Sequence, residues 1–258
     1  MRKTTIILLL SIFASSSGIC QKQMTEVIIC STVHGAHTIN PNYSYNTLFK
    51  FIENYNPDII GVEIRNEDID SSLTYLKNNY PFEMYECIKK YPDMKVLGFD
   101  WLGSDIEGKA IPENYWEKIS TIKKTQQKLN QDSIMLKKLT ILKVVAEEKN
   151  KLALNTSLYE MNDGRYDIIN YIYYKQLAEL LQNTEYEVLS DFYQQRDEQI
   201  ALNIIEIIKS NLGKKMIFLI GADHRYYTLE KVQQVFGNQI MLNNFDQTNT
   251  DIKVEKSE

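Results

Sequence analysis

The sequence predicts an α/β fold, in which a mostly parallel central sheet is flanked by helices and carries a large helical insertion. The first observation behind this prediction is the alternation of short, apolar, β-branched runs with longer segments of helical periodicity, which is typical of βαβ units. The second is the long segment between the third and fourth runs, which has helical periodicity and no strand-like stretch. With 258 residues and 43% apolar content, the chain is large enough for one such domain with a sizeable core.

Five strand-like runs are predicted, at residues 26–32, 58–64, 95–101, 216–221 and 239–242. A helical segment over residues 43–55 precedes the second run and is closed by Asn56-Pro57. Another helix precedes the third run and ends at Tyr91-Pro92, because the residue before a proline disfavours helical backbone. The helix before the fourth run is expected to end near Gly213, since glycine is common just past helix C-termini.

The helical insertion is predicted over about residues 113–210, within a single domain that covers residues 21–246. Apolar residues recur there at spacings of three and four, and turn-forming residues at 155–157 and 162–164 divide the segment into separate helices. We expect the insertion to cap one edge of the sheet, and we expect residues 247–258 to form a flexible tail.

The N-terminus has the order of regions that is typical of a secretory signal peptide. Arg2 and Lys3 precede an apolar run over residues 6–14, and small residues follow at 15–18. The apolar run is too short to span a bilayer, which takes roughly twenty residues. We therefore predict that residues 1–20 are a signal peptide and that the protein is exported, either periplasmic or secreted. Lipid attachment at Cys20 is less favoured, because Ile19 is larger than the residue that normally precedes a lipoprotein cysteine.

Composition argues against some partners. The 29 Lys and Arg against 34 Asp and Glu give a formal charge of −5 without a basic patch, which argues against nucleic acid or an anionic membrane as the main partner. The sequence has no second long apolar stretch, so no transmembrane segment is expected in the mature chain. Cys30 is predicted to be a small core residue. A disulfide between Cys30 and Cys87 is compatible with export, but the sequence does not establish it.

Chemistry-bearing side chains follow four of the predicted strands. His34 and His37 follow the first and His224 follows the fourth, while Glu63 and Asp100 stand near the ends of the second and third. Each alone has an ordinary explanation, such as a surface histidine, a helix N-cap or an ion-pair partner. Because the carboxyl ends of parallel strands share one edge of the sheet, where ligands bind, the set together predicts a functional site.

Imidazole and carboxylate groups together suit two kinds of chemistry. They can bind a divalent cation such as zinc, manganese or cobalt, which lowers the pKa of bound water and polarises a carbonyl. Without a metal, a histidine and a glutamate can act on a water as general base and orienting group. The sequence contains no His-Glu-x-x-His, Gly-x-Ser-x-Gly, phosphate-binding or Gly-x-Gly-x-x-Gly motif, so serine hydrolase, NTPase and dinucleotide-binding functions have no support.

Two arginines are further candidates whose roles the sequence leaves open. Arg65 follows the second run and is placed either to bind a substrate carboxylate or to pair with Glu67 or Asp68. Arg196-Asp197 is predicted to begin the helix before the fourth strand, where one or both could equally be surface charges.

Taken in order, these motifs resemble those of the TraB/PrgY/GumN/Tiki proteins, whose wider relatives are the erythromycin-esterase and ChaN-like proteins. The resemblance covers most of the mature chain and rests on Ser-Thr-Val-His34, Gly-Val-Glu63-x-Arg65, Arg196-Asp197 and Gly221-x-x-His224. Two departures matter. Ser31 stands where the family's first motif usually has a glycine, and ChaN-like relatives bind haem instead of catalysing hydrolysis.

The resemblance implies an α/β core with a helical insertion and, for the Tiki branch, metal-dependent peptide hydrolysis. Carried onto this chain, it implies that His34, Glu63 and His224 hold the metal, with Arg65 and Arg196 as supporting residues. Of these two, Arg65 would help to hold an anionic substrate or intermediate.

We therefore expect an exported, metal-dependent hydrolase that cuts a peptide or ester bond in a peptide or small-molecule substrate. His34, Glu63 and His224 would hold zinc, manganese or cobalt, with His37 and Asp100 as further candidate ligands or proton-transfer groups. Two alternatives stay open. The same crevice could bind haem or a peptide without catalysis, or His34 and Glu63 could form a metal-free esterase.

Overall fold

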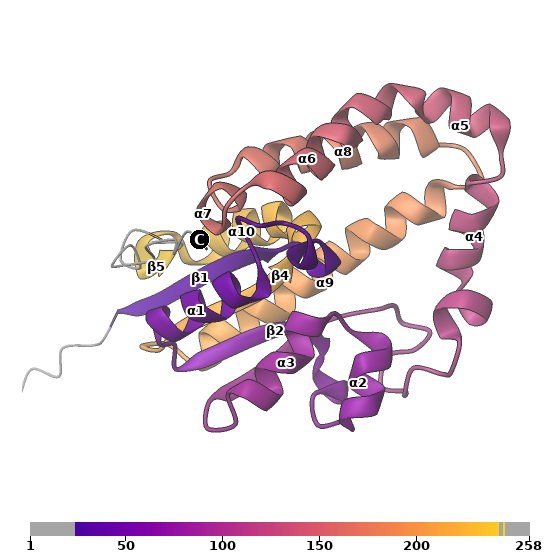
Figure 1. Cartoon of the computed structure of the whole chain (residues 1–258). Coiled ribbons are helices and arrows are strands. Elements are labelled where there is room, and N and C mark those ends of the chain that lie inside the picture. Colours follow the sequence, from indigo (N-terminus) through magenta and orange to yellow (C-terminus); the bar gives the residue numbers. More distant parts are fainter. Residues whose placement is uncertain (1–23, 243–244, 246–258) are drawn as a thin grey trace, which may run out of the picture.

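Five parallel strands form one sheet at the centre of the computed structural model, which describes residues 24–242 and residue 245. The strands are β1 (Thr25–Thr32), β2 (Ile59–Arg65), β3 (Lys95–Asp100), β4 (Lys215–Gly221) and β5 (Ile240–Leu242), in the order β3-β2-β4-β1-β5 (Figure 1). All neighbouring strands pair in parallel. The α/β class is confirmed, and each predicted strand ends within one residue of the observed one. The predicted signal peptide over residues 1–20, with Cys20, and the predicted tail over residues 247–258 lie outside the described residues.

The strands are buried on both faces of the sheet, which explains their continuous apolar sequences. Alternate residues of β1 point to opposite faces, so Ile28 and Cys30 belong to one core and Val27 and Ile29 to the other. The first core is completed by α1 (Tyr45–Tyr55), α3 (Phe82–Lys90) and the short α7 (Leu158–Met161). The second is completed by α9 (Glu187–Ser210) and α10 (Ala222–Phe236).

The helical insertion lies between β3 and β4, as predicted. It runs through a π-helical turn (Tyr115–Ile119), α4 (Thr121–Leu129), α5 (Ser133–Leu139), a 3₁₀ turn (Thr140–Leu142), α6 (Lys143–Asn155), α7, α8 (Arg165–Leu181) and α9. Figure 1 shows α5 and α6 following one another alongside α8, with α4 linking them to the remainder of the molecule. One expectation needs correction: α9 does not cap an edge but packs on a face of the sheet, through Ile200, Ile204 and Ile208.

Side-chain caps fix the starts of several helices. Ser44, Ser72 and Asp132 accept backbone N–H groups at the starts of α1, α2 (Leu73–Asn79) and α5. Three further 3₁₀ turns complete the described elements, at His34–Thr38, Asn66–Asp68 and Gly237–Gln239. By contrast, α9 begins without a side-chain cap. The start of this helix is therefore difficult to predict from the sequence.

The chain leaves two neighbouring strands toward opposite faces of the sheet. After β1 it enters α1 on one face, and after β4 it enters α10 on the other. Because β1 and β4 are adjacent in the sheet, this divergence opens the space at their carboxyl ends. Such a switch point is the usual ligand-binding position of an open parallel sheet.

Cys30 and Cys87 are buried free thiols, so the disulfide that an exported location permits is not formed. Burial raises the pKa of Cys30 to about 11, which keeps its thiol protonated and unreactive. The prediction that Cys30 is a core residue is confirmed. Among the described residues, no helix is both long enough and apolar enough to cross a membrane.

Candidate functional site

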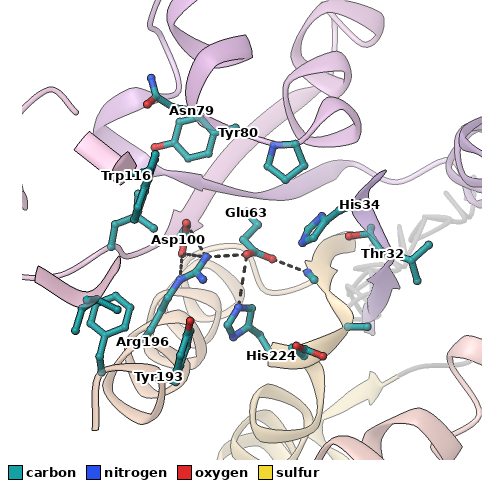
Figure 2. A pocket seen from close by; sticks show the side chains of 18 of the residues that line it. Thr32, His34, Glu63, Asn79, Tyr80, Asp100, Trp116, Tyr193, Arg196 and His224 are labelled. Carbon is teal, nitrogen blue, oxygen red and sulfur yellow. Dashed lines mark hydrogen bonds and ion pairs between the residues drawn. The ribbon is translucent and has the colours of Figure 1, made fainter. Parts of the chain in front are cut away.

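A cavity of about 560 Å³ lies at the carboxyl ends of the strands (Figure 2). Residues at or just beyond the ends of β1, β2, β3 and β4 line one part of it, and residues of the insertion line the rest. The structure brings together five of the sequence-predicted candidates, which are His34, Glu63, Asp100, Arg196 and His224.

The Glu63 carboxylate lies between the other groups, and only 5% of this residue is exposed. Its Oε1 accepts a hydrogen bond from Arg196 Nη2 at 2.8 Å, and its Oε2 accepts one from the backbone N–H of Gly221 at 2.5 Å. His224 Nε2 lies 3.8 Å from Oε1. Burying a carboxylate is costly unless it is paired, and both oxygens of Glu63 have partners.

His34 lies beside Glu63, just beyond the end of β1 (Figure 2). Its backbone φ is 47°, a left-handed conformation that residues with a side chain adopt only at some cost. Its Nδ1 is hydrogen-bonded to Glu83 Oε1 at 2.8 Å, and Glu83 is fully buried on α3. Since Nδ1 is engaged by this carboxylate, Nε2 is the ring nitrogen left to face the cavity.

His224 has the same construction as His34. It lies in the first turn of α10, with 8% of the residue exposed. Its Nδ1 is hydrogen-bonded to Asp197 Oδ1 on α9, and its Nε2 points to Glu63. The two imidazoles therefore converge on one carboxylate, and each is oriented by a second carboxylate behind it.

Gly221, the last residue of β4, keeps a small space open between these groups. A Cβ at this position would lie 2.8 Å from His34 Nε2 and 3.0 Å from Glu63 Oε2. The glycine is needed for close approach, because any side chain here would fill the space between the imidazole and the carboxylate. The space beside His34 Nε2 and Glu63 Oε2 suits a small polar ligand such as a water or a cation.

The charges in the cavity shift the pKa values of these groups. Burial alone would raise the pKa of Glu63, but positive charges led by His224 outweigh it and lower that pKa, so Glu63 is ionised. Burial alone would lower the pKa of His34, but the hydrogen bond to Glu83 and the charge of Glu63 raise it. The pKa of His224 is raised too, because Asp197 and Glu63 outweigh burial and a neighbouring arginine. Without a metal, the site therefore raises the proton affinity of both imidazoles, and a cation bound there would have to displace those protons.

Arg196 reaches the site from within α9, so the prediction that Arg196-Asp197 begins a helix is wrong. Its Nε donates to Asp100 Oδ1 at 3.0 Å and its Nη2 to Asp100 Oδ2 at 3.1 Å, in addition to Glu63. Burial, together with the charge of Glu63, raises the pKa of Asp100 in spite of Arg196. The arginine thus ties the carboxyl ends of β2 and β3 to the insertion, and neither it nor Asp197 is a surface charge.

His37 does not line the cavity, and its assignment as a candidate ligand or proton-transfer group is wrong. Its Nδ1 donates to the backbone oxygen of Tyr43 at 2.7 Å, and its Nε2 accepts the N–H of Val33 at 3.1 Å. Both ring nitrogens are therefore used within the turn that follows β1. His37 shapes the turn that carries His34.

Arg65 is buried outside the cavity, so its assignment to the substrate is not supported by its position. Its Nε donates to Asp68 Oδ2 at 2.8 Å, and its Nη1 and Nη2 donate to the backbone oxygens of Ile106 and Lys109. Glu67 lies 3.1 Å from Nη1. Of the two roles that the sequence leaves open, the structure shows ion pairing, with Glu67 and Asp68. The hydrogen bonds to the two backbone oxygens connect the segment after β3 to the end of β2.

Replacing Arg65 by methionine is expected to lower the free energy of unfolding by about 2 kcal/mol, because hydrogen bonds of a buried charged group are lost. The cost is limited because Tyr75 and Tyr80 still donate to Asp68. Denaturant unfolding checks the stability, and metal titration of the folded variant should match the parent. A variant of normal stability that no longer bound metal would instead show that Arg65 contributes to the functional site.

Glu83 and Asp197 are functional candidates that the sequence does not single out as partners of the histidines. Glu83 lies 49 positions from His34 and Asp197 lies 27 positions from His224. Glu83 belongs to no recognisable motif, and only the Arg196-Asp197 dipeptide drew attention to Asp197. Contacts between residues so far apart in sequence depend on how α3 and α9 pack, and local sequence patterns do not predict that packing.

Asp223 is a further residue that the sequence does not indicate. Its carboxylate accepts hydrogen bonds from the hydroxyls of Tyr166, at 2.7 Å, and Tyr174, at 3.0 Å, and pairs with Lys149 Nζ at 3.0 Å. Those three partners lie on α6 and α8, and Asp223 is next to His224. Asp223 therefore joins the insertion to the turn that carries one of the two site histidines.

The ligand atoms around Glu63 are of the chemical types that bind a divalent cation. Two imidazole nitrogens and a carboxylate are ligands that zinc and similar ions accept, and a carboxylate at the other ring nitrogen is the usual partner of a metal-binding histidine. The space that a Cβ at Gly221 would fill adjoins two of the three donors. Within residues 24–242, however, no group of three or more His, Cys, Asp or Glu side chains is close enough to hold a metal ion as it stands.

Comparisons with known proteins add no assignment. No protein-family model matches the chain, no curated protein matches its sequence, and no solved structure matches it. Function is therefore inferred from the residues of the cavity, which are two imidazoles each hydrogen-bonded to a carboxylate, the ionised Glu63 between them, and the guanidinium of Arg196.

Proposed function

We propose that the chain is an exported hydrolase of peptide or ester bonds, of the TraB/PrgY/GumN/Tiki type that its motifs resemble, and that His34, Glu63 and His224 hold a divalent cation. One observation carries the proposal, namely the shared construction of the two histidines. Each has a carboxylate at Nδ1 and leaves Nε2 for the space around Glu63. This pairing fixes the ring orientation and makes Nε2 a better donor to a metal.

A bound cation would supply the polarisation of water and of a carbonyl group. Glu63 contributes the negative charge that a cation requires, and its lowered pKa keeps that charge at neutral pH. Arg196 contributes a fixed positive charge: although burial opposes it, Asp100 and Glu63 raise the pKa of its guanidinium. A positive charge held in place beside the reacting carbonyl stabilises the negative charge that develops on its oxygen during hydrolysis.

The wall of the cavity supports a substrate with apolar or aromatic groups. Beyond the charged residues, the lining is rich in aromatic side chains, among them Tyr80, Trp116, Phe192 and Tyr193. Such walls bind apolar substrate groups, while the few charged groups orient the bond to be cut. A volume of about 560 Å³ suits a small molecule or a peptide segment of a few residues.

Metal content tests the proposal directly. The purified protein is equilibrated with zinc, manganese or cobalt, freed of loose ions and analysed, beside the double variant His34→Ala/His224→Ala. About one equivalent of metal in the parent and none in the double variant is the expected result. Glu179→Gln, which alters an exposed carboxylate outside the lining of this cavity, is the control and should retain the metal. A panel of peptides and esters then tests hydrolysis by the loaded protein and by Glu63→Gln, which should be inactive.

Hydrolysis assays with and without metal also distinguish the metal-dependent enzyme from a second candidate function, a metal-free esterase that uses His34 as general base. The ion pair between Arg196 and Glu63 favours this candidate, since it neutralises the central carboxylate without a metal. Hydrolysis that survives in full after metal removal, and is lost in His34→Ala, would select it. Loss of hydrolysis in chelator, restored by one of the three metals, would select the metal-dependent enzyme.

A further inference from the structure

A second cavity, of about 340 Å³, lies between α8, α9 and α10. Five tyrosines line it: Tyr171, Tyr174, Tyr193, Tyr226 and Tyr227. The ring centroids of Tyr171 and Tyr226 are 4.8 Å apart, and those of Tyr174 and Tyr193 are 5.9 Å apart. Tyr174 and Tyr193 line the first cavity as well, so they form part of the wall between the two.

Three carboxylates share this lining with the tyrosines: Asp197, Asp223 and Glu230. Asp197 is hydrogen-bonded to His224, and Asp223 is paired with Lys149. Glu230 is exposed. One lysine, Lys175, also lines the cavity; it is exposed, and its Nζ lies 6.0 Å from the ring centroid of Tyr171. Among the lining residues, acidic side chains therefore outnumber basic ones, and tyrosine is the most frequent residue.

The protein already holds one cation by this chemistry next to the cavity. Lys149 is only 8% exposed, and lysine is among the residues least often buried. Its Nζ lies 4.6 Å and 4.9 Å from the ring centroids of Tyr173 and Tyr174, and 3.0 Å from Asp223 Oδ1. Tyrosine faces and an aspartate thus compensate here for the water that the ammonium group loses.

We infer that the second cavity binds a small organic cation, an alkylammonium group of the size of a trimethylated amine. Ring faces attract such a cation, and Glu230 supplies its counter-charge, since Asp197 and Asp223 are already paired with His224 and Lys149. An inorganic cation is disfavoured, because tyrosine faces do not replace the oxygen ligands that such ions require. A neutral ligand of the same shape would gain only the burial of apolar surface. The inference is independent of the hydrolase proposal, since it uses a different cavity and predicts binding without turnover.

Calorimetric titration with choline tests the inference, with 3,3-dimethylbutan-1-ol as the neutral molecule of the same shape. We expect one choline to bind per chain and the alcohol to bind at least about tenfold more weakly, because only choline gains the attraction of the ring faces and of Glu230. Equal affinity for both ligands would show a merely apolar cavity and would overturn the inference. The absence of choline binding would overturn it as well.

Substitutions locate the site. Tyr226→Leu and Glu230→Gln change residues that line the second cavity and not the first, and each is expected to weaken choline binding about fivefold or more. Glu179→Gln, an exposed glutamate of α8 outside the cavity lining, is the matched charge control and should bind like the parent. If Tyr226→Leu does not fold, Tyr171→Leu replaces it, because 44% of Tyr171 is exposed. Unchanged binding in folded variants of both kinds would refute the assignment.

Discussion

Gly221→Ala is expected to lower metal affinity and hydrolysis by about 100-fold or more while the protein stays folded. The new Cβ would lie 2.8 Å from His34 Nε2 and 3.0 Å from Glu63 Oε2, so it would occupy the space that both atoms face. No donor atom is removed by this change. Loss of function would therefore show that the space itself is the binding site, which substitution of a ligand cannot show.

The measurement combines metal titration, hydrolysis and thermal unfolding of the same variant. Gly35→Ala is the matched control, since Gly35 is next to His34 in sequence but a Cβ there would meet nothing within 4 Å. This control should behave like the parent in all three measurements. Normal metal affinity in a folded Gly221→Ala protein would mean that the cation lies elsewhere in the cavity.

The sheet could be predicted from the sequence because its strands are buried on both faces. A strand such as β4, which is buried from Met216 to Gly221, appears in the sequence as an unbroken apolar run. The same property made Glu63 conspicuous, since a carboxylate inside such a run needs a partner. The order of the strands in the sheet could not be predicted from these apolar runs, because it depends on which faces of the sheet the helices cover.

The positions of His34 and His224 could be predicted because they depend only on the ends of strands. Parallel strands place their carboxyl ends at one edge, so residues that follow β1 and β4 reach the same edge, and the adjacency of these two strands brings the residues together. His37 shows the limit of that argument. It lies three positions from His34, but the 3₁₀ turn directs its ring into the protein, where the backbone uses both nitrogens.

The carboxylates behind the histidines could not be predicted, for a physical reason. Glu83 and Asp197 lie on helices, where an acidic residue is ordinary, and their role exists only after α3 and α9 have packed on opposite faces of the sheet. The sequence names Arg196 but leaves its role open, the resemblance alone implies a supporting role, and the predicted place of Arg196 at a helix start is wrong. Since α9 lacks a side-chain cap, nothing local marks its true start at Glu187.

Arg196→Met is expected to lower the free energy of unfolding by about 3–5 kcal/mol at pH 7, in the absence of metal. The substitution removes the guanidinium that pairs with both Glu63 and Asp100, and these residues are each only 5% exposed. Breaking a buried ion pair from one side leaves uncompensated charge, which costs more than the pair contributes. Denaturant unfolding of parent and variant measures the difference.

The pH dependence of the stability difference between the parent and Arg196→Met shows whether the difference is electrostatic. In the parent the pKa of Glu63 is lowered, so its contribution to stability is present at neutral pH and is lost as the pH falls. In the variant Glu63 and Asp100 repel each other without the guanidinium between them, and the imidazoles beside Glu63 compensate only in part, so the pKa values of both carboxyl groups rise relative to the parent. The penalty applies to their charged forms. That penalty disappears as the pH falls toward about 4, the ordinary value for a carboxyl group. The stability gap between parent and variant should therefore narrow steadily from pH 7 to pH 4.

Two further variants complete the argument. Asp100→Asn combined with Arg196→Met removes one of the two buried charges and should recover part of the lost stability, because the remaining carboxylate keeps the N–H of Gly221 and the nearby imidazole of His224. Arg165→Met removes an arginine that also pairs with an aspartate but is 53% exposed, and should leave stability unchanged. A gap that stayed constant with pH would mean that Arg196 acts through packing, and the cavity would then lack the electrostatic organisation from which its chemistry is inferred.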